Sequence, residues 1–240
     1  MSGKSDYEKV CEFNKAFDFP QYNDFSNEKT LKLRLDLIKE ELDELKEAYS
    51  NNDTVEILDA CADILYVAYG MAYTYKINSD EFLNYLVLNK NMSLFKNIVS
   101  NNSNNTKNIE IKEIINMIYE EYNKLETYCK ENNQKWIDTL HNIILYVYEL
   151  QKQMKYDSDK IFTIVHDSNM SKLCKSEIEA QQTVEKYQQE YNSGKSPYDS
   201  VCYYKLKDSD LYVIKNKSTG KALKSINYTK VKLHICDLLL

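Results

Sequence analysis

Residues 40–69 read EELDELKEAYSNNDTVEILDACADILYVAY and hold two acidic groups on either side of a polar turn. Apolar residues recur among them at three- and four-residue steps, which predicts two helices that each bury one face. If these helices pack antiparallel across the turn at 51–53, their acidic stripes face each other. The acidic residues are Glu40, Glu41 and Glu44 in the first group and Glu56, Asp59 and Asp63 in the second.

Carboxylates at the edge of an apolar helix face are costly to bury unless a cation lies between them. A solvated helix face is the ordinary explanation for such residues, and it fits Glu47. It fits Asp63 poorly, because apolar residues lie on both sides of it. Two facing acidic helices supply the oxygen ligands that a hard cation such as Mg²⁺ prefers. The stretch therefore points to metal-dependent phosphate chemistry.

The composition is that of an ordinary globular protein. The chain of 240 residues is 43% hydrophobic and 28% charged, and its 4 glycines and 2 prolines favour long helices. A net charge of −6 argues against nucleic-acid binding, which needs a cationic face. The six cysteines lack a metal-binding spacing, and no signal peptide or membrane-spanning run stands out. We expect reduced thiols in a cytoplasmic protein without nucleic-acid or membrane partners.

Apolar periodicity predicts helices along most of the chain, and the pattern changes near Tyr198. Strand-like segments at 201–206 and 211–214 flank a polar turn, which predicts a β-hairpin. We therefore expect a mainly α protein, a helical bundle followed by a small C-terminal β-hairpin. The expected helices are 6–17, 30–50, 55–75, 79–91, 109–131, 136–154, 158–167 and 176–191.

Three short segments recur in the same order along the chain. Their spacing is 80 residues for the first two and 78 for the third, and each lies on a matching predicted helix. We interpret this as a tandem duplication of one helical module, with chance similarity as the alternative. The paired segments are 38–41 with 118–121, 65–67 with 145–147, and 91–93 with 169–171.

The duplication predicts four parts of the chain. They are a helical module with the metal site at 1–98, a polar linker at 99–108, a degenerate second module at 109–195, and the hairpin with its tail at 196–240.

The second module has lost the acidic chemistry. At the spacing of 80, Glu44 becomes Lys124, Asp59 becomes Thr139 and Asp63 becomes Ile143. A lysine and an isoleucine in these places cannot hold a divalent cation. The second module instead has Lys172 after its Asn-Met-Ser segment, where the first has Leu94. We expect one composite site with carboxylates from the first module and a lysine with small polar groups from the second. A plain surface lysine is the alternative for Lys172.

At these residues the sequence resembles the MazG-like superfamily of all-α nucleoside triphosphate pyrophosphohydrolases, which includes phosphoribosyl-ATP pyrophosphohydrolases and dimeric dUTPases. The signature EExxE, followed by an acidic motif and a Leu-Tyr run, stands here at 40–44 and 59–67. Segments 12–17, 165–173 and 220–228 resemble one branch of stand-alone members. Members usually build the site from two identical subunits. The degenerate module departs from that pattern and leaves a pseudo-dimeric monomer and a homodimer as the alternatives.

The resemblance implies Mg²⁺-dependent hydrolysis of a (d)NTP to the (d)NMP and diphosphate in nucleotide-pool sanitation. A pyrimidine deoxynucleotide such as dUTP is the first candidate substrate, and Mn²⁺ is expected to substitute for Mg²⁺. The implied metal ligands are Glu40, Glu41, Glu44, Asp59 and Asp63, with Glu41 also the catalytic base and Glu56 a supporting acid. The implied phosphate-binding residues are Lys172, Asn169, Ser171 and Lys224. Phe13 and Phe17 are candidates for stacking on the base, with core packing as their alternative.

Two other functions remain open on the sequence. A catalytically silent helical module that binds nucleotides or proteins would keep the fold without turnover, but the intact set of five carboxylates argues against it. Phosphoribosyl-ATP hydrolysis is the lesser alternative, and the extended C-terminal hairpin makes it less attractive.

Overall fold

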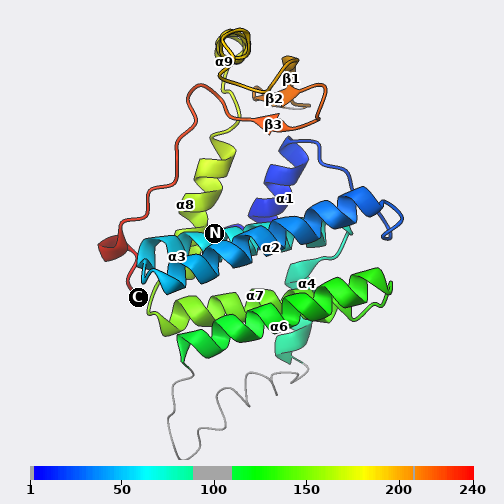
Figure 1. The fold of residues 1–240 in the computed structure, drawn as a ribbon, viewed down its shortest axis with the longest axis vertical. Helices are drawn as coiled ribbons and strands as arrows, with labels where there is room; N and C mark the ends of the chain where they lie inside the picture. The colour runs from blue at the N-terminus through cyan, green and yellow to red at the C-terminus, as the bar shows by residue number, and fades with distance from the viewer. Residues whose placement is uncertain (1–2, 89–109, 208) are drawn as a thin grey trace, which may run out of the picture. The chain divides into compact units, whose positions relative to one another are not determined.

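A computed structural model describes residues 3–88, 110–207 and 209–240 (Figure 1). The chain is mainly helical with a small antiparallel sheet near its C-terminus, which confirms the predicted fold class. The helices are α1 (Asp6–Ala16), α2 (Glu28–Ser50), α3 (Thr54–Thr74), α4 (Ser79–Leu88), α6 (Ile111–Lys130), α7 (Trp136–Gln153), α8 (Ser158–Met170), α9 (Glu177–Asn192) and the short 3₁₀ helix η1 (Ile235–Asp237). The strands are β1 (Val201–Lys205), β2 (Tyr212–Asn216) and β3 (Ala222–Leu223).

The chain forms two compact units. The first comprises Met1–Cys11, Pro20–Phe162 and Leu233–Leu240, and the second comprises Glu12–Phe19 and Thr163–Lys232. Both predicted helical pairs, α2 with α3 and α6 with α7, therefore belong to the first unit. The predicted linker at 99–108 and the segment 91–93 lie outside the described residues.

Helices α2 and α3 pack against each other because each has an apolar face. The buried residues of α2 recur at three- and four-residue steps, as the sequence predicts, and α3 is buried around most of its circumference. Asp53 caps α3 by accepting hydrogen bonds from the backbone N–H groups of Val55 and Glu56. The buried residues of α2 are Leu35, Ile38, Leu42, Leu45 and Ala48.

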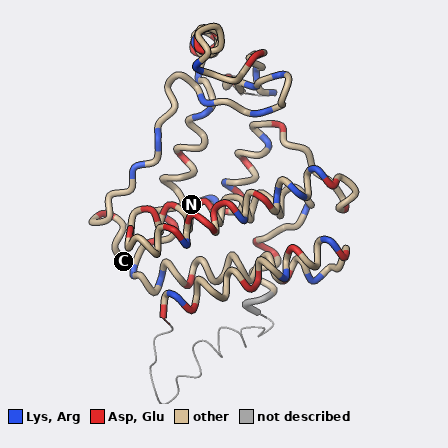
Figure 2. Tube along the Cα trace, in the orientation of Figure 1, with Lys and Arg blue, Asp and Glu red and all other residues tan. Residues whose placement is uncertain are grey.

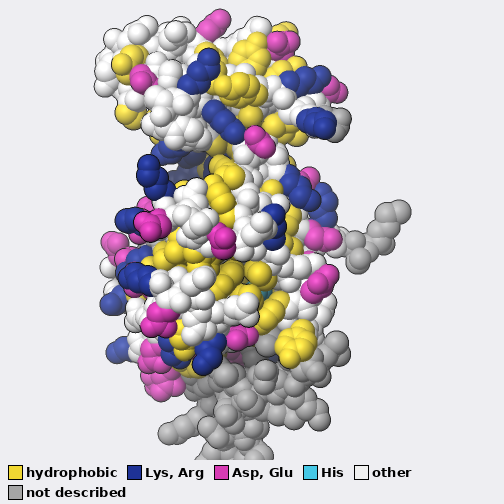
Figure 3. Space-filling model, turned by 90° about the vertical axis from the view of Figure 1, so that its right-hand side faces the viewer, with side chains coloured by type: hydrophobic (Ala, Val, Ile, Leu, Met, Phe, Trp, Pro, Cys, Tyr) yellow, Lys and Arg dark blue, Asp and Glu magenta, His cyan; other side chains and the backbone are white. Residues whose placement is uncertain are grey.

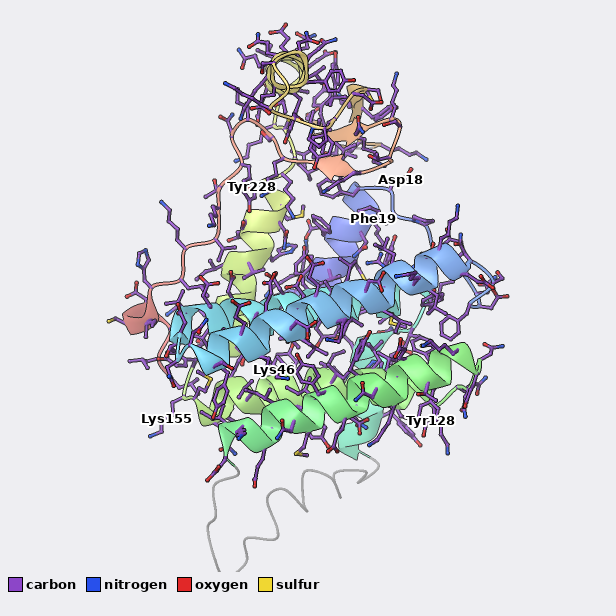
Figure 4. All side chains as sticks on the ribbon, viewed as in Figure 1. Asp18, Phe19, Lys46, Tyr128, Lys155 and Tyr228 are labelled. Carbon is purple, nitrogen blue, oxygen red and sulfur yellow. The ribbon has the colours of Figure 1, made fainter. Side chains whose placement is uncertain are left out.

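Helices α6 and α7 form a second pair that packs on the first, with α6 against α2 and α7 against α3. Tyr119 ties α6 to α2, since its hydroxyl donates to the carbonyl of Leu42 at 2.8 Å. Its ring also lies 5.5 Å from the ammonium of Lys46, which is labelled on α2 in Figure 4. The first unit thus has a four-helix core.

Helices in both pairs end in the same backbone conformation. Asn52 ends α2 with φ 55° and Asn132 ends α6 with φ 51°, and the two are 80 residues apart. Lys76 after α3 and Lys155 after α7 have φ 58° and 65°. A left-handed residue just after the last turn is a common helix ending, and Asp18 after α1 has it too, with φ 54°. The duplication therefore stays a prediction.

The second unit is built on the three-stranded sheet β1–β2–β3. Helix α9 packs on β1 and β2 through a core that includes Ala180, Ile214 and Leu223. A second, separate cluster contains Phe17, Leu173 and Val213. The sequence predicts only a two-stranded hairpin, and β3 is the difference. It is two residues long, too short to give a strand pattern, and it pairs with β2 through the turn at Gly220.

No helix among the described residues is long and apolar enough to cross a membrane. All six cysteines are free thiols, as the sequence predicts.

Candidate active site

The acidic residues predicted as metal ligands lie on the packed helices α2 and α3. Three- and four-residue spacing places those of each helix on one side, and Figure 2 shows acidic positions along both helices. Glu41, Asp59 and Asp63 are half-buried, and the Oδ1 atom of Asp59 is inaccessible to water. Glu40 and Glu44 are exposed. The predicted supporting acid, Glu56, is also exposed at the start of α3.

The electrostatics of Glu41 show that the five predicted ligands form one group. Burial raises the pKa of Glu41, and the negative charges of Asp63, Glu44, Glu40 and Asp59 raise it further, to about 8. Like charges at short range disfavour ionisation of a carboxyl group. Such a concentration of negative charge among partly buried side chains is typical of a functional site.

The donor chemistry of this group fits a hard divalent cation, because every donor is a carboxylate oxygen. The geometry is not yet that of a coordination sphere. Within residues 3–88, 110–207 and 209–240, no three acidic, histidine or cysteine side chains are gathered closely enough to hold a metal ion. Without a cation the carboxylates repel one another, so ligation requires their side chains to turn toward a shared point.

Replacing Glu41 with glutamine is expected to stabilise the metal-free protein at pH 8. Its folded-state pKa of about 8 lies above its ordinary value of 4.5, so the folded chain loses stability as pH rises through that interval. Solvent screening limits the expected gain for Glu41→Gln to about 1–2 kcal/mol at pH 8, with almost none at pH 5. Urea denaturation with EDTA at both pH values measures it. Glu47→Gln, at an exposed place on α2, should leave the free energy of unfolding unchanged at both pH values. A gain for Glu41→Gln that does not depend on pH would contradict the interpretation.

At the corresponding place on α6 and α7, neighbouring side chains balance the negative charge that remains. Glu121, which matches Glu41 at the spacing of 80, is only 7% exposed. It accepts hydrogen bonds from Lys124 Nζ at 2.7 Å and Asn142 Nδ2 at 3.0 Å. Ile143 is fully buried, and the hydroxyl of Thr139 donates to the carbonyl of Trp136. An ammonium group thus supplies the positive charge beside Glu121, which supports the prediction that this pair holds no metal.

Replacing Lys124 with methionine is expected to lower the free energy of unfolding by about 1–2 kcal/mol, because buried Glu121 loses its cationic partner. The loss stays below the full cost of a broken buried pair, since Lys124 itself is half-exposed. The midpoint of urea denaturation measures the change. Lys130→Met breaks the exposed pair with Glu126 and should cost no more than about 0.5 kcal/mol. Equal effects of the two substitutions would contradict the role assigned to Lys124.

The residues predicted to bind phosphate and base belong to the second unit. Lys172 Nζ donates to Asn169 Oδ1 and lies 5.6 Å from the centre of the Phe13 ring, so three of these residues meet. Ser171 bonds to the backbone, donating to the carbonyl of Ser168 and accepting from the N–H of Thr229. Lys224 lies 4.4 Å from the ring centre of Tyr228. Phe17 is fully buried in the core, which favours the packing alternative for that residue.

One feature of the acidic helices was missed by the sequence reasoning. Arg34 is the only arginine of the chain and lies seven residues before Glu41, on the same side of α2. A Cβ atom on Gly70 of α3 would lie 3.0 Å from its Nη1 atom, so glycine gives the guanidinium room against α3. Burial lowers the pKa of Arg34. The sequence contains a signal of this approach, because Arg34 lies seven residues before Glu41 and Gly70 lies seven residues after Asp63.

Comparisons with known proteins agree with the acidic motif. Residues 10–90 match the family model described as phosphoribosyl-ATP pyrophosphohydrolase, and this range includes α2 and α3. Over 238 residues the chain is 39% identical to the uncharacterized protein L479 of Acanthamoeba polyphaga mimivirus, covering 92% of this chain and 91% of that protein. No solved structure matches the chain.

Proposed function

Because this chain belongs to the all-α superfamily of MazG-like and phosphoribosyl-ATP pyrophosphohydrolases, we propose that it hydrolyses a nucleoside triphosphate to the monophosphate and diphosphate. Its family is one of pyrophosphohydrolases, enzymes that cleave phosphoric anhydrides. The observation that carries the proposal is the charge cluster around Glu41 on α2 and α3. A cluster that destabilises the metal-free fold does not serve its stability. Perturbed pKa values gather at functional sites, so the cluster favours a catalytic role.

The proposed site requires a divalent cation, Mg²⁺ or Mn²⁺, held by the five carboxylates. When bound, the cation supplies neutralisation of the polyphosphate charge and makes water easier to deprotonate. Its ligands would be Glu40, Glu41, Glu44, Asp59 and Asp63.

Glu41 is the proposed general base. A cation held beside Glu41 would favour its ionised carboxylate, which is the form that accepts a proton. Glu41 takes the proton of the attacking water as the water oxygen bonds to the α-phosphorus. The bond between that phosphorus and the bridging oxygen breaks, and diphosphate departs with the bonding electron pair. Lys172 and Lys224 remain the proposed cations for phosphate oxygens, as point charges.

The proposed substrate is a pyrimidine deoxynucleoside triphosphate such as dUTP, in keeping with a role in nucleotide-pool sanitation. The packing of α2 and α3 on α6 and α7 within one unit supports a pseudo-dimeric monomer with one catalytic site, and light scattering of the purified chain tests this against a homodimer.

The test is a panel of ribo- and deoxynucleoside triphosphates with the full chain and Mg²⁺, together with phosphoribosyl-ATP. Diphosphate and orthophosphate are measured separately. Hydrolysis at the α-phosphorus releases one diphosphate per nucleotide and no orthophosphate. Release of orthophosphate with a nucleoside diphosphate, or no turnover of any substrate, would contradict the proposal. Turnover of phosphoribosyl-ATP alone would favour the narrower activity of the matched family.

A further inference from the structure

The second unit contains a hollow of about 730 Å³ formed by residues outside the predicted active site. Its walls are the last turn of α1, the end of α8 and the hairpin of β1 and β2. Sites for small molecules have volumes of roughly 300–1,000 Å³ and combine apolar walls with a few polar groups. The hollow therefore has the size of a small-molecule site.

The register of the sheet explains why this face is open. Tyr204 is paired with Val213, and Cys202 with Lys215, so these side chains point to one face of the sheet. The opposite face, which carries Ile214, is covered by α9. On the open face, Val213 is buried in the cluster with Phe17, while Tyr204 beside it is 48% exposed. The hollow thus has an apolar floor next to an accessible aromatic ring.

Four lysines surround this floor, namely Lys15, Lys205, Lys207 and Lys215. Lys205 pairs with Asp210 at 3.0 Å, but both side chains are largely exposed, so the pair is weak. In the part of the chain that the structure describes, the other three lysines form no ion pair. Figure 3 shows lysine and apolar side chains interspersed on one face of the α9 and sheet region.

The charge of the whole second unit is also favourable for an anion. It contains 13 lysines against 10 acidic residues, whereas the rest of the chain contains 18 basic against 27 acidic residues. Two carboxylates, Glu12 and Asp18, also line the hollow on its α1 side. A ligand that fits must therefore be anionic at one end, aromatic or apolar in the middle, and able to donate hydrogen bonds.

We propose that this hollow binds a nucleoside phosphate without a divalent cation, as a second site built from residues other than the catalytic carboxylates. The base lies on Tyr204 and the apolar floor, the lysines hold the phosphates, and Glu12 or Asp18 accepts a hydrogen bond from the 3′-hydroxyl of the sugar. The choice of a nucleotide among aromatic anions rests on the proposed function, because nucleotides are then the substrate and the product.

Calorimetric titration of the full chain with dUTP and dUMP in EDTA tests the site. We expect binding that Lys207→Ala with Lys215→Ala weakens at least about tenfold, because two phosphate contacts are lost. The control pair Lys195→Ala with Lys230→Ala removes the same charge at exposed places of the same unit. Circular dichroism checks that each variant is folded. No binding in EDTA, or equal weakening by both pairs, would overturn the proposal.

Inorganic diphosphate is the second probe. If it binds as tightly as dUTP, the aromatic ring and floor contribute nothing and the assignment to a nucleotide is wrong. The two proposals fail separately: nucleotide binding in EDTA without diphosphate release under Mg²⁺ contradicts only the proposed function. Diphosphate release by a chain that binds nothing in EDTA contradicts only the second nucleotide site.

Discussion

Asp63→Asn is expected to lower the rate of diphosphate release by about 10³-fold or more, a loss typical for removal of a key electrostatic group. Among the charges that raise the pKa of Glu41, that of Asp63 has the largest effect. The substitution therefore removes a carboxylate ligand and changes the environment of the proposed base. The amide has nearly the same shape, which keeps the packing of α3 intact. The measurement is the initial rate with the best substrate at saturating Mg²⁺.

The same substitution should leave the fold at least as stable as before, because it removes a charge that repels Glu41. Asp36→Asn is the matched control: Asp36 lies on α2, is exposed and pairs with Lys32. It should retain the full rate. An Asp63→Asn chain that keeps the activity would contradict the site, and one that loses activity only because it unfolds would show a lower melting temperature.

The sequence predicted the helices of the site because their physical causes are local. The apolar steps of α2 and the capping residue Asp53 are read directly from neighbouring letters. The mutual effect of Glu41 and Asp63 follows from helix geometry once the two helices are taken to be antiparallel. Local pattern was therefore enough to place the carboxylates on neighbouring helices, although not in the geometry of a metal site.

Other features depend on pairing between distant residues and did not show in the pattern. The hydrogen bond from Asn142 on α7 to Glu121 on α6 requires the register of the two helices, whereas the one from Lys124 is local to α6. The lysine hollow depends on which face of the sheet α9 covers, and the alternation of Tyr203 and Tyr204 alone does not say which one is exposed. Strand β3 forms by pairing with the edge of β2.

Ile143→Asp is expected to lower the free energy of unfolding by about 4 kcal/mol, because it places a carboxyl group where no water reaches. Ile143 is fully buried on α7, whereas its counterpart Asp63 is half-buried at the edge of α3. A loss of this size corresponds to a melting temperature lower by roughly 8–16 °C in a chain of this length. Burial raises the pKa of such an aspartate, so the loss should be smaller near pH 4 than at pH 8.

Ile143→Val is the control and should cost only about 1 kcal/mol, since it removes one buried methylene group. The comparison decides whether the second helical pair is a dormant metal site or a permanently repacked one. If Ile143→Asp leaves the melting temperature unchanged and Mg²⁺ then raises it, α6 and α7 retain a second acidic metal site. If the variant unfolds early whether or not Mg²⁺ is present, isoleucine has become part of the core. The Lys124–Glu121 pair favours the second outcome, because an ammonium group already supplies the positive charge there.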